Sequence, residues 1–200
     1  PLLQRLQVHL EAEQPLRTMA LTEAEDTLLR GYTFLSQKPL ILLLNVGESE
    51  IGQPLPPAVL ALAERRQFAT LSLSARIEME IAQMEAEEAA AFLTALGIAE
   101  PARDRLIRLA YETLRLLSFF TVGPDECRAW TLPHGATALQ AAGRIHSDLA
   151  RGFIRAEVIA FADLHTCGSW NAARERGRLR LEGRDYVLQD GDCMSVRFNV

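Results

Sequence analysis

The sequence has 200 residues, 48% of them hydrophobic and 24% charged, so it can build a real core and does not belong to the intrinsically disordered class. Its net charge of −5 lies in the first 116 residues, because the stretch from Leu117 onward carries as many acidic as basic residues. These 200 residues contain neither the long apolar run of a membrane-spanning helix nor, at their start, the basic-then-apolar pattern of a signal peptide.

Arginine and cysteine usage bears on partners and compartment. Lys38 is the only lysine, so the second part of the chain draws its positive charge from arginine. This fits local contact with RNA phosphates without requiring it. Cys127, Cys167 and Cys193 are widely spaced and form no metal-binding pattern, so we expect reduced thiols in a cytoplasmic protein.

The first residues predict helices. Pro1 to Glu13 carries apolar residues at helical spacing, which indicates the end of an amphipathic helix. The chain starts without Met and inside this helix, so we expect a fragment of a longer protein. A second helix is predicted after Thr22, because Thr22 is a suitable N-cap and Glu25, three residues later, completes a capping box.

Two segments of the first part are typical of strands. Leu40 to Leu44 is an unbroken apolar run after Pro39, as in a fully buried strand of a parallel sheet. Phe68 to Leu73 alternates and predicts a second strand. Between these strands, a helix is predicted from the end of the proline-rich loop at 54–57 to about Arg66. Further helices are predicted over 77–81, over 85–96 with Gly97 as the C-cap, and over 101–116. Because two parallel strands bury too little surface, we expect more strands and an active-site loop upstream.

The last third changes character. Strands are predicted over 117–122 and 126–132, joined by the turn dipeptide Gly123-Pro124. A helix over 137–146, a strand over 153–161 and one or two short helices within 163–176 follow. Two final strands, 186–189 and 194–198, are predicted to be joined by a turn at Asp190-Gly191-Asp192. This order predicts a β-grasp-like α+β module.

Asn45 and Glu48 form the first candidate site, directly after the predicted buried strand. Ligands bind at this end of the strands in open α/β sheets. An amide offers a donor and an acceptor to a nucleobase, and a carboxylate accepts from exocyclic N–H groups. Ser74-Ala75, at the end of the next strand, could add backbone N–H groups to the same ligand. The alternative is an ordinary turn, in which Asn and Glu are common.

The second part carries weaker candidates. His146 beside Asp148 has the residue types of a general base pair, but capping or packing is the stronger interpretation, and His134 is expected to be exposed in a turn. Trp130 and Trp170 could stack on bases or pack in the core. Cross-strand ion pairs on the solvent face are expected for Glu126, Arg128, Arg151, Arg155 and Glu157.

A cluster of arginines could contact RNA phosphates, or could belong to a solvated charged face offset by nearby acids. Its members are Arg174, Arg176, Arg178, Arg180 and Arg184. The sequence contains no GxxxxGK[ST], GxGxxG, HExxH or GxSxG motif. The chain by itself is therefore not expected to cradle a triphosphate or to act as an enzyme.

Nearly the whole chain resembles the YchF/Obg-like ATPase family, a branch of the Obg-related P-loop GTPases. The segments that carry the resemblance are 119–131, 134–137, 140–148, 151–158, 183–186, 189–192 and 198–200. The resemblance implies an α/β fold, a partial P-loop nucleotide-binding domain, followed by a β-grasp α+β TGS domain. It assigns 1–33 to the end of a helical (coiled-coil) insertion and its return helix, 34–116 to the C-terminal part of the nucleotide domain, and 117–200 to the TGS domain.

The resemblance also implies a nucleotide site. The family replaces the usual Asn-Lys-x-Asp guanine motif with Asn-x-x-Glu, which matches Asn45 and Glu48 with Val46 between them. Guanine donates from N1–H and N2–H to the usual Asp, and adenine has neither group, so binding and hydrolysis of ATP, or of GTP, with Mg²⁺ is implied for the intact protein. Ser74-Ala75 matches a later base-contacting loop, and the P-loop and magnesium ligands would lie upstream.

The implied partner is the ribosome or ribosomal RNA, contacted through the TGS domain. We expect no DNA sequence readout, no membrane association and a cytoplasmic monomer. The alternative function is a non-catalytic RNA- or protein-binding adaptor built on a β-grasp module.

Overall fold

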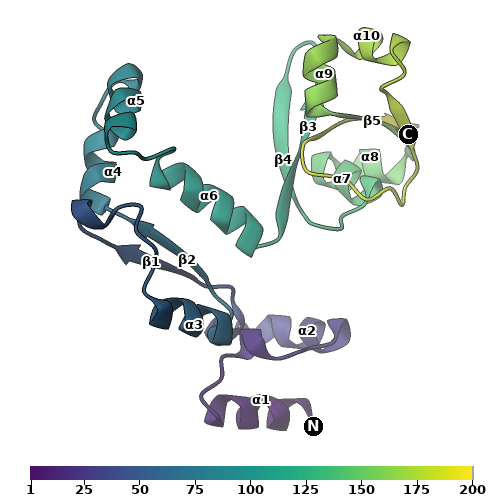
Figure 1. The fold of residues 1–200 in the computed structure, drawn as a ribbon. Helices are drawn as coiled ribbons and strands as arrows, with labels where there is room; N and C mark the ends of the chain where they lie inside the picture. Colours follow the sequence, from purple (N-terminus) through teal and green to yellow (C-terminus); the bar gives the residue numbers. More distant parts are fainter. Residues whose placement is uncertain (200) are drawn as a thin grey trace. The chain divides into compact units, whose positions relative to one another are not determined.

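The computed structural model describes residues 1–199, and Val200, the last residue of the predicted second domain, lies outside them. The chain divides into two compact units, Pro1–Thr113 and Leu114–Val200 (Figure 1). Each unit has hydrophobic clusters of its own.

The first unit combines helices with a pair of parallel strands. Its main elements are α1 (Leu2–Glu11), α2 (Glu23–Leu29), β1 (Ile41–Asn45), α3 (Pro57–Arg66), β2 (Ala69–Leu73), α4 (Ala75–Ile81), α5 (Ala86–Ala95) and α6 (Ala102–Thr113). β1 and β2 are parallel, with Asn45 opposite Leu73 at their carboxyl ends. The predicted capping box is confirmed: Thr22 N–H donates to the Glu25 carboxylate at 2.9 Å, and Glu25 N–H donates to the Thr22 hydroxyl at 3.3 Å.

Two details of the first unit differ from the prediction. β1 is only half-buried, and Leu43 is 44% exposed, because β2 is its only neighbouring strand among residues 1–199. The last predicted helix was too long: α6 ends at Thr113, and Arg115 takes a positive φ of 51° before the next strand begins at Leu116. A residue in that left-handed conformation cannot continue a helix.

The second unit is a mixed five-stranded sheet with helices on both faces. Its elements are β3 (Leu116–Val122), β4 (Cys127–Pro133), α7 (Ala138–Ile145), α8 (Ser147–Arg151), β5 (Phe153–Ala160), α9 (Phe161–Cys167), α10 (Trp170–Glu175), β6 (Arg180–Glu182) and β7 (Asp192–Phe198). The strand order is β4-β3-β7-β5-β6, in which β3 and β7 are parallel and the other neighbours antiparallel.

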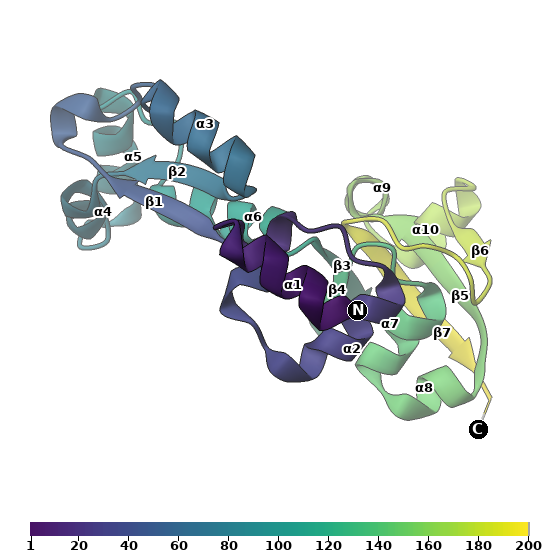
Figure 2. The same ribbon diagram turned by 90° about the horizontal axis from the view of Figure 1, so that it is seen from below.

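Strand alternation supplies a core on each face of this sheet. Phe119 of β3 is fully buried in the cluster that contains the α7 alanines, and these small side chains let the helix approach the sheet closely. Phe120, the next residue, belongs to the opposite cluster with Leu164 of α9 and Ala173 of α10. α7 and α8 lie side by side (Figure 2).

The predicted hairpin of two final strands is wrong. Residues 186–189 form no strand, although Val187 makes an isolated bridge with Thr137. Leu188 N–H donates to Ala136 O at 3.0 Å, and Ala138 N–H donates to Tyr186 O at 2.8 Å. The backbone of this segment is therefore bonded to the start of α7, and the sheet instead gains the short strand β6, which the pattern did not predict.

Candidate functional site

The first candidate site lies where the two parallel strands end. Asn45 is the last residue of β1, and β2 leads through Ser74 into α4. The Asn45 side-chain Oδ1 accepts a hydrogen bond from Ala75 N–H at 3.0 Å, and Val46 N–H donates to Leu73 O at 2.9 Å. Parallel pairing therefore brings together four of the five predicted base-site residues. Asn45 and Val46 lie at the end of one strand, and Ser74 and Ala75 follow the other, about 30 positions later in the chain.

This hydrogen bond orients the Asn45 amide. Because Oδ1 accepts from Ala75, Nδ2 is the group left to donate, and it has no hydrogen-bond partner among residues 1–199. Asn45 is exposed, so a ligand can reach this donor. An acceptor such as purine N7, which adenine and guanine share, suits it.

Ser74 and Ala75 support the site in a different way from the expected one. The Ala75 N–H, expected to face a ligand, donates to Asn45 and so acts as an orienting group. Ser74 is buried, 7% exposed, and its side chain does not cap α4. The Ala75 N–H therefore holds the amide of Asn45 in place.

Glu48 supplies an uncommitted carboxylate three residues after Asn45. It begins a short 3₁₀ helix, Glu48–Glu50, and is exposed. Glu50, rather than Glu48, accepts from Gly47 N–H at 3.1 Å. The Glu48 carboxylate makes no hydrogen bond or ion pair within the described chain, so it is available to accept from an exocyclic N–H group of a ligand.

The helix that follows the site is anchored to α6. Glu78 of α4 accepts from Ala102 N–H at 2.8 Å and from Arg103 N–H at 3.3 Å, at the start of α6. Val46, which follows β1, lines a small cavity together with Ser74 and Glu78, among others. A displacement of α4 would therefore act directly on the first turn of α6.

Metal and membrane features are limited in the described residues. No group of three or more His, Cys, Asp or Glu side chains in residues 1–199 is arranged to hold a metal ion. Over the same residues, no helix has both the length and the apolar character to cross a bilayer. The three cysteines are free, and burial raises the pKa of Cys193 to about 11, so this thiol stays protonated.

Three of the five clustered arginines have oxygen partners within the chain. Arg174 lies 2.9 Å from the carboxylate of Glu157, Arg180 lies 3.2 Å from Asp192, and Arg184 donates to Phe153 O at 3.1 Å. Arg197 also pairs with Glu157. These contacts connect Arg174 of α10 and both ends of the segment 180–184 to β5 and β7.

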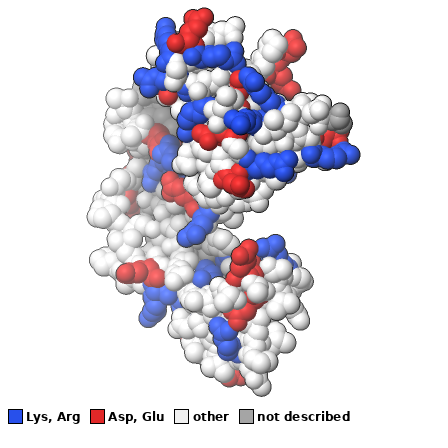
Figure 3. Space-filling model, turned by 90° about the vertical axis from the view of Figure 1, so that its right-hand side faces the viewer, with Lys and Arg blue, Asp and Glu red and all other residues white. Residues whose placement is uncertain are grey.

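Arg176 and Arg178 are less constrained. Both are exposed; Arg176 lies 3.9 Å from the Cys167 sulfur, and the Arg178 side chain has no hydrogen bond or ion pair within residues 1–199. On the face drawn in Figure 3, basic and acidic side chains are interspersed. These two arginines are therefore the members of the cluster best able to meet a phosphate.

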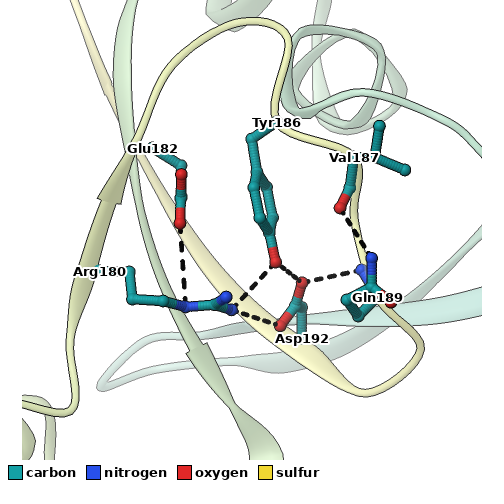
Figure 4. Close-up of polar contacts among 6 residues, drawn as sticks. All are labelled: Arg180, Glu182, Tyr186, Val187, Gln189 and Asp192. Atoms are coloured by element: carbon teal, nitrogen blue, oxygen red, sulfur yellow. Dashed lines mark hydrogen bonds and ion pairs between the residues drawn. The ribbon is translucent and has the colours of Figure 1, made fainter.

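The Asp192 carboxylate is the centre of a buried polar network (Figure 4). It is 2% exposed and accepts from Tyr186 OH at 2.8 Å, from Gln189 N–H at 2.9 Å and from Arg180 at 3.2 Å. Burial, followed by the hydrogen bond to Asp192, raises the pKa of Tyr186, so its hydroxyl remains a donor. Arg180 also approaches Glu182 at 3.9 Å.

The histidine and tryptophan candidates have structural roles. His146 Nδ1 accepts from Asp148 N–H at 3.2 Å and caps α8, as the capping interpretation predicted. Trp130 Nε1 donates to Thr121 at 3.0 Å, and Trp170 Nε1 donates to Val122 O at 3.1 Å. Both indoles pack against the cores of the second unit.

The expected solvent-face ion pairs are only partly present. Glu157 is buried, 8% exposed, because Arg174 and Arg197 reach it from α10 and β7. Arg151 pairs with Asp148 within α8, and Arg128 lies over the Trp130 ring. None of these pairs joins two directly opposed residues of neighbouring strands.

Comparisons with known proteins bear on both units. The family described as YchF-GTPase_C, protein of unknown function (DUF933), matches residues 116–199. The ribosome-binding ATPase YchF of Haemophilus ducreyi is 44% identical over 200 residues, which cover 100% of this chain and 55% of that protein. The protein of the same name from Bacillus subtilis is 42% identical over 205 residues, covering 100% of this chain and 56% of the relative.

A solved structure agrees with these relatives. The YchF GTPase of Schizosaccharomyces pombe superimposes with a TM-score of 0.86 at 27% sequence identity, and the match covers 98% of this chain and 53% of that chain. The chain therefore spans about half the length of the relatives it matches.

Proposed function

The chain belongs to the YchF family, and on this premise we propose that it is the C-terminal part of a ribosome-associated ATPase. Residues 1–33 are the end of a helical insertion, 34–116 complete a P-loop nucleotide domain, and 117–200 form a β-grasp TGS domain. The mixed sheet packed on α7 supports the last assignment. The relatives named ribosome-binding ATPase support the function as a whole.

The observation that carries the nucleotide proposal is the hydrogen bond between Ala75 N–H and Asn45 Oδ1. It leaves Asn45 Nδ2 to donate to purine N7 and leaves no N–H of Ala75 for guanine O6. Glu48 then accepts from the exocyclic amino group of adenine. These residues fit a base, whereas phosphate and Mg²⁺ binding belongs to the rest of the intact protein, since this sequence contains no P-loop.

The first test compares the affinities of the intact protein for ATP and GTP. We expect tighter binding of ATP, and we expect Glu48→Ala to lower the ATP affinity about fivefold to tenfold, the value of one hydrogen bond. Ser49→Ala, the neighbouring exposed position, serves as the matched control and leaves the affinity unchanged. Calorimetric titration measures both. Equal or tighter binding of GTP by the unmodified protein would contradict the adenine assignment.

The second part of the proposal concerns ribosome binding by the second unit. Arg176 and Arg178 are the exposed arginines of the cluster with the fewest intramolecular contacts, and phosphate contacts of this kind are salt-dependent. We expect the double variant Arg176→Gln with Arg178→Gln to weaken co-sedimentation of the intact protein with ribosomes. The dependence of the logarithm of affinity on the logarithm of salt concentration should become shallower by about two units.

The control for that measurement removes the same charge elsewhere in the second unit. Arg144 and Arg155 are exposed, and neither forms an ion pair within residues 1–199, so Arg144→Gln with Arg155→Gln is a matched pair. Unchanged binding of the Arg176/Arg178 variant at two salt concentrations would remove these arginines from the interface. An intact protein that binds ribosomes but neither ATP nor GTP would instead be an adaptor.

A further inference from the structure

Within the second unit, β4 has an outer edge whose backbone is open at Cys127 and Ala129. It is an edge strand, and β3 is its only partner among the described residues. The bond from Gly123 N–H to Glu126 O at the turn fixes the alternation of the antiparallel ladder. Residues two apart share a direction, so Cys127 and Ala129 carry their N–H and C=O groups toward the outer edge.

An apolar pocket of about 550 Å³ opens beside this edge. It lies on the sheet face that α9 partly covers (Figure 1), and its walls include Phe120 of β3 and Phe161 and Leu164 of α9. Cys127 and Ala129 form the side nearest the edge. Their small side chains leave the space unfilled, and Phe161 remains 54% exposed. Open backbone groups and an apolar pocket therefore adjoin each other.

A cation lies across the same edge on the other face. Arg128 lies between Cys127 and Ala129 and also lines the pocket, but strand alternation directs its side chain to the opposite face, where its guanidinium carbon is 4.4 Å from the centre of the Trp130 ring. It is exposed and forms no ion pair with an acidic residue in the described chain. Any strand added to this edge would meet apolar walls on one face and an unpaired positive charge on the other.

We propose that the outer edge of β4 binds an extended peptide segment of another protein in which apolar and acidic residues alternate. The peptide backbone pairs with Cys127 and Ala129, two apolar side chains enter the pocket, and the acidic side chain between them faces Arg128. The period of a strand matches this arrangement. Pairing with β4 of a second copy is disfavoured, because it would bring two Arg128 side chains to one face.

The test uses the 200-residue chain and a phage-displayed library of random dodecapeptides. Selected peptides are expected to contain an apolar-acidic-apolar alternation, and a synthetic peptide of that sequence should slow amide hydrogen exchange at Cys127 and Ala129. Ala129→Phe fills the pocket and should weaken binding about tenfold, as loss of an anchor pocket does. Ala162→Phe makes the same change on α9 outside the pocket lining and should leave the affinity within about twofold.

A charge exchange gives a second readout, should Ala129→Phe disturb folding. Arg128→Glu should weaken binding of the acidic peptide and favour a peptide with Lys in place of the acidic residue. The proposal is overturned if no peptide is selected. It is also overturned if bound peptides leave the amides of Cys127 and Ala129 unprotected, because a peptide that only inserts an aromatic side chain into the pocket would not pair with the backbone of β4. Concentration-dependent self-association that protects the same amides would also overturn it, in favour of pairing between copies.

Discussion

Asp192→Asn is expected to lower the free energy of unfolding of the second unit by about 3 kcal/mol. The buried carboxylate accepts from Tyr186 and Gln189 through Oδ2 and from Arg180 through Oδ1. An asparagine keeps only one acceptor oxygen. In one orientation its NH₂ group faces the guanidinium, and in the other it faces two donors, so a buried donor is left unpaired either way.

Urea unfolding followed by tryptophan fluorescence measures this change for the second unit alone, because both tryptophans, Trp130 and Trp170, belong to it. Asp185→Asn is the matched control, since Asp185 is exposed in the same connection and makes no ion pair within residues 1–199. We expect it to alter the free energy of unfolding by less than about 0.5 kcal/mol. Equal stability of the two variants would show that the Asp192 network contributes nothing net to folding.

This network illustrates what the sequence could not predict. Tyr186 to Gln189 has the composition of a strand. Its backbone instead makes hydrogen bonds to Ala136 and Ala138, about 50 positions earlier, and no local pattern predicts these contacts. Asp192 was expected only in a turn between strands; its partners come from β6 and from the segment 186–189. Gly152 is similar: a side chain there would lie 2.1 Å from Asn199 O, a constraint that no local pattern carries.

Features with local causes were predicted well. The capping box of Thr22 and Glu25 depends on residues three apart, and the two strands of the first unit follow from an apolar run after Pro39 and from the alternation over 68–73. Strand identity in turn predicted that the ends of β1 and β2 share an edge. The direction of the Asn45–Ala75 hydrogen bond could not be predicted, because it depends on the loop geometry between β2 and α4.

That hydrogen bond underlies the largest expected effect on ligand binding. Asn45→Ala should lower the ATP affinity of the intact protein about 30-fold to 100-fold, or roughly 2 to 3 kcal/mol. The change removes the Nδ2 donor to purine N7 and also the acceptor that holds the backbone of Ala75. The freed Ala75 N–H can then donate to guanine O6, so the affinity for GTP should fall less than the affinity for ATP.

Asn45→Asp separates the two roles of this side chain. A carboxylate still accepts from Ala75 N–H and keeps the loop after β2 in place, but it cannot donate to N7 and repels the lone pair there. We therefore expect it to lose affinity for ATP and GTP alike, without the shift toward GTP that Asn45→Ala should show. Fluorescent-nucleotide titrations of both variants distinguish these outcomes. Wild-type affinity in Asn45→Asp would mean that Asn45 orients the loop and makes no contact with the base.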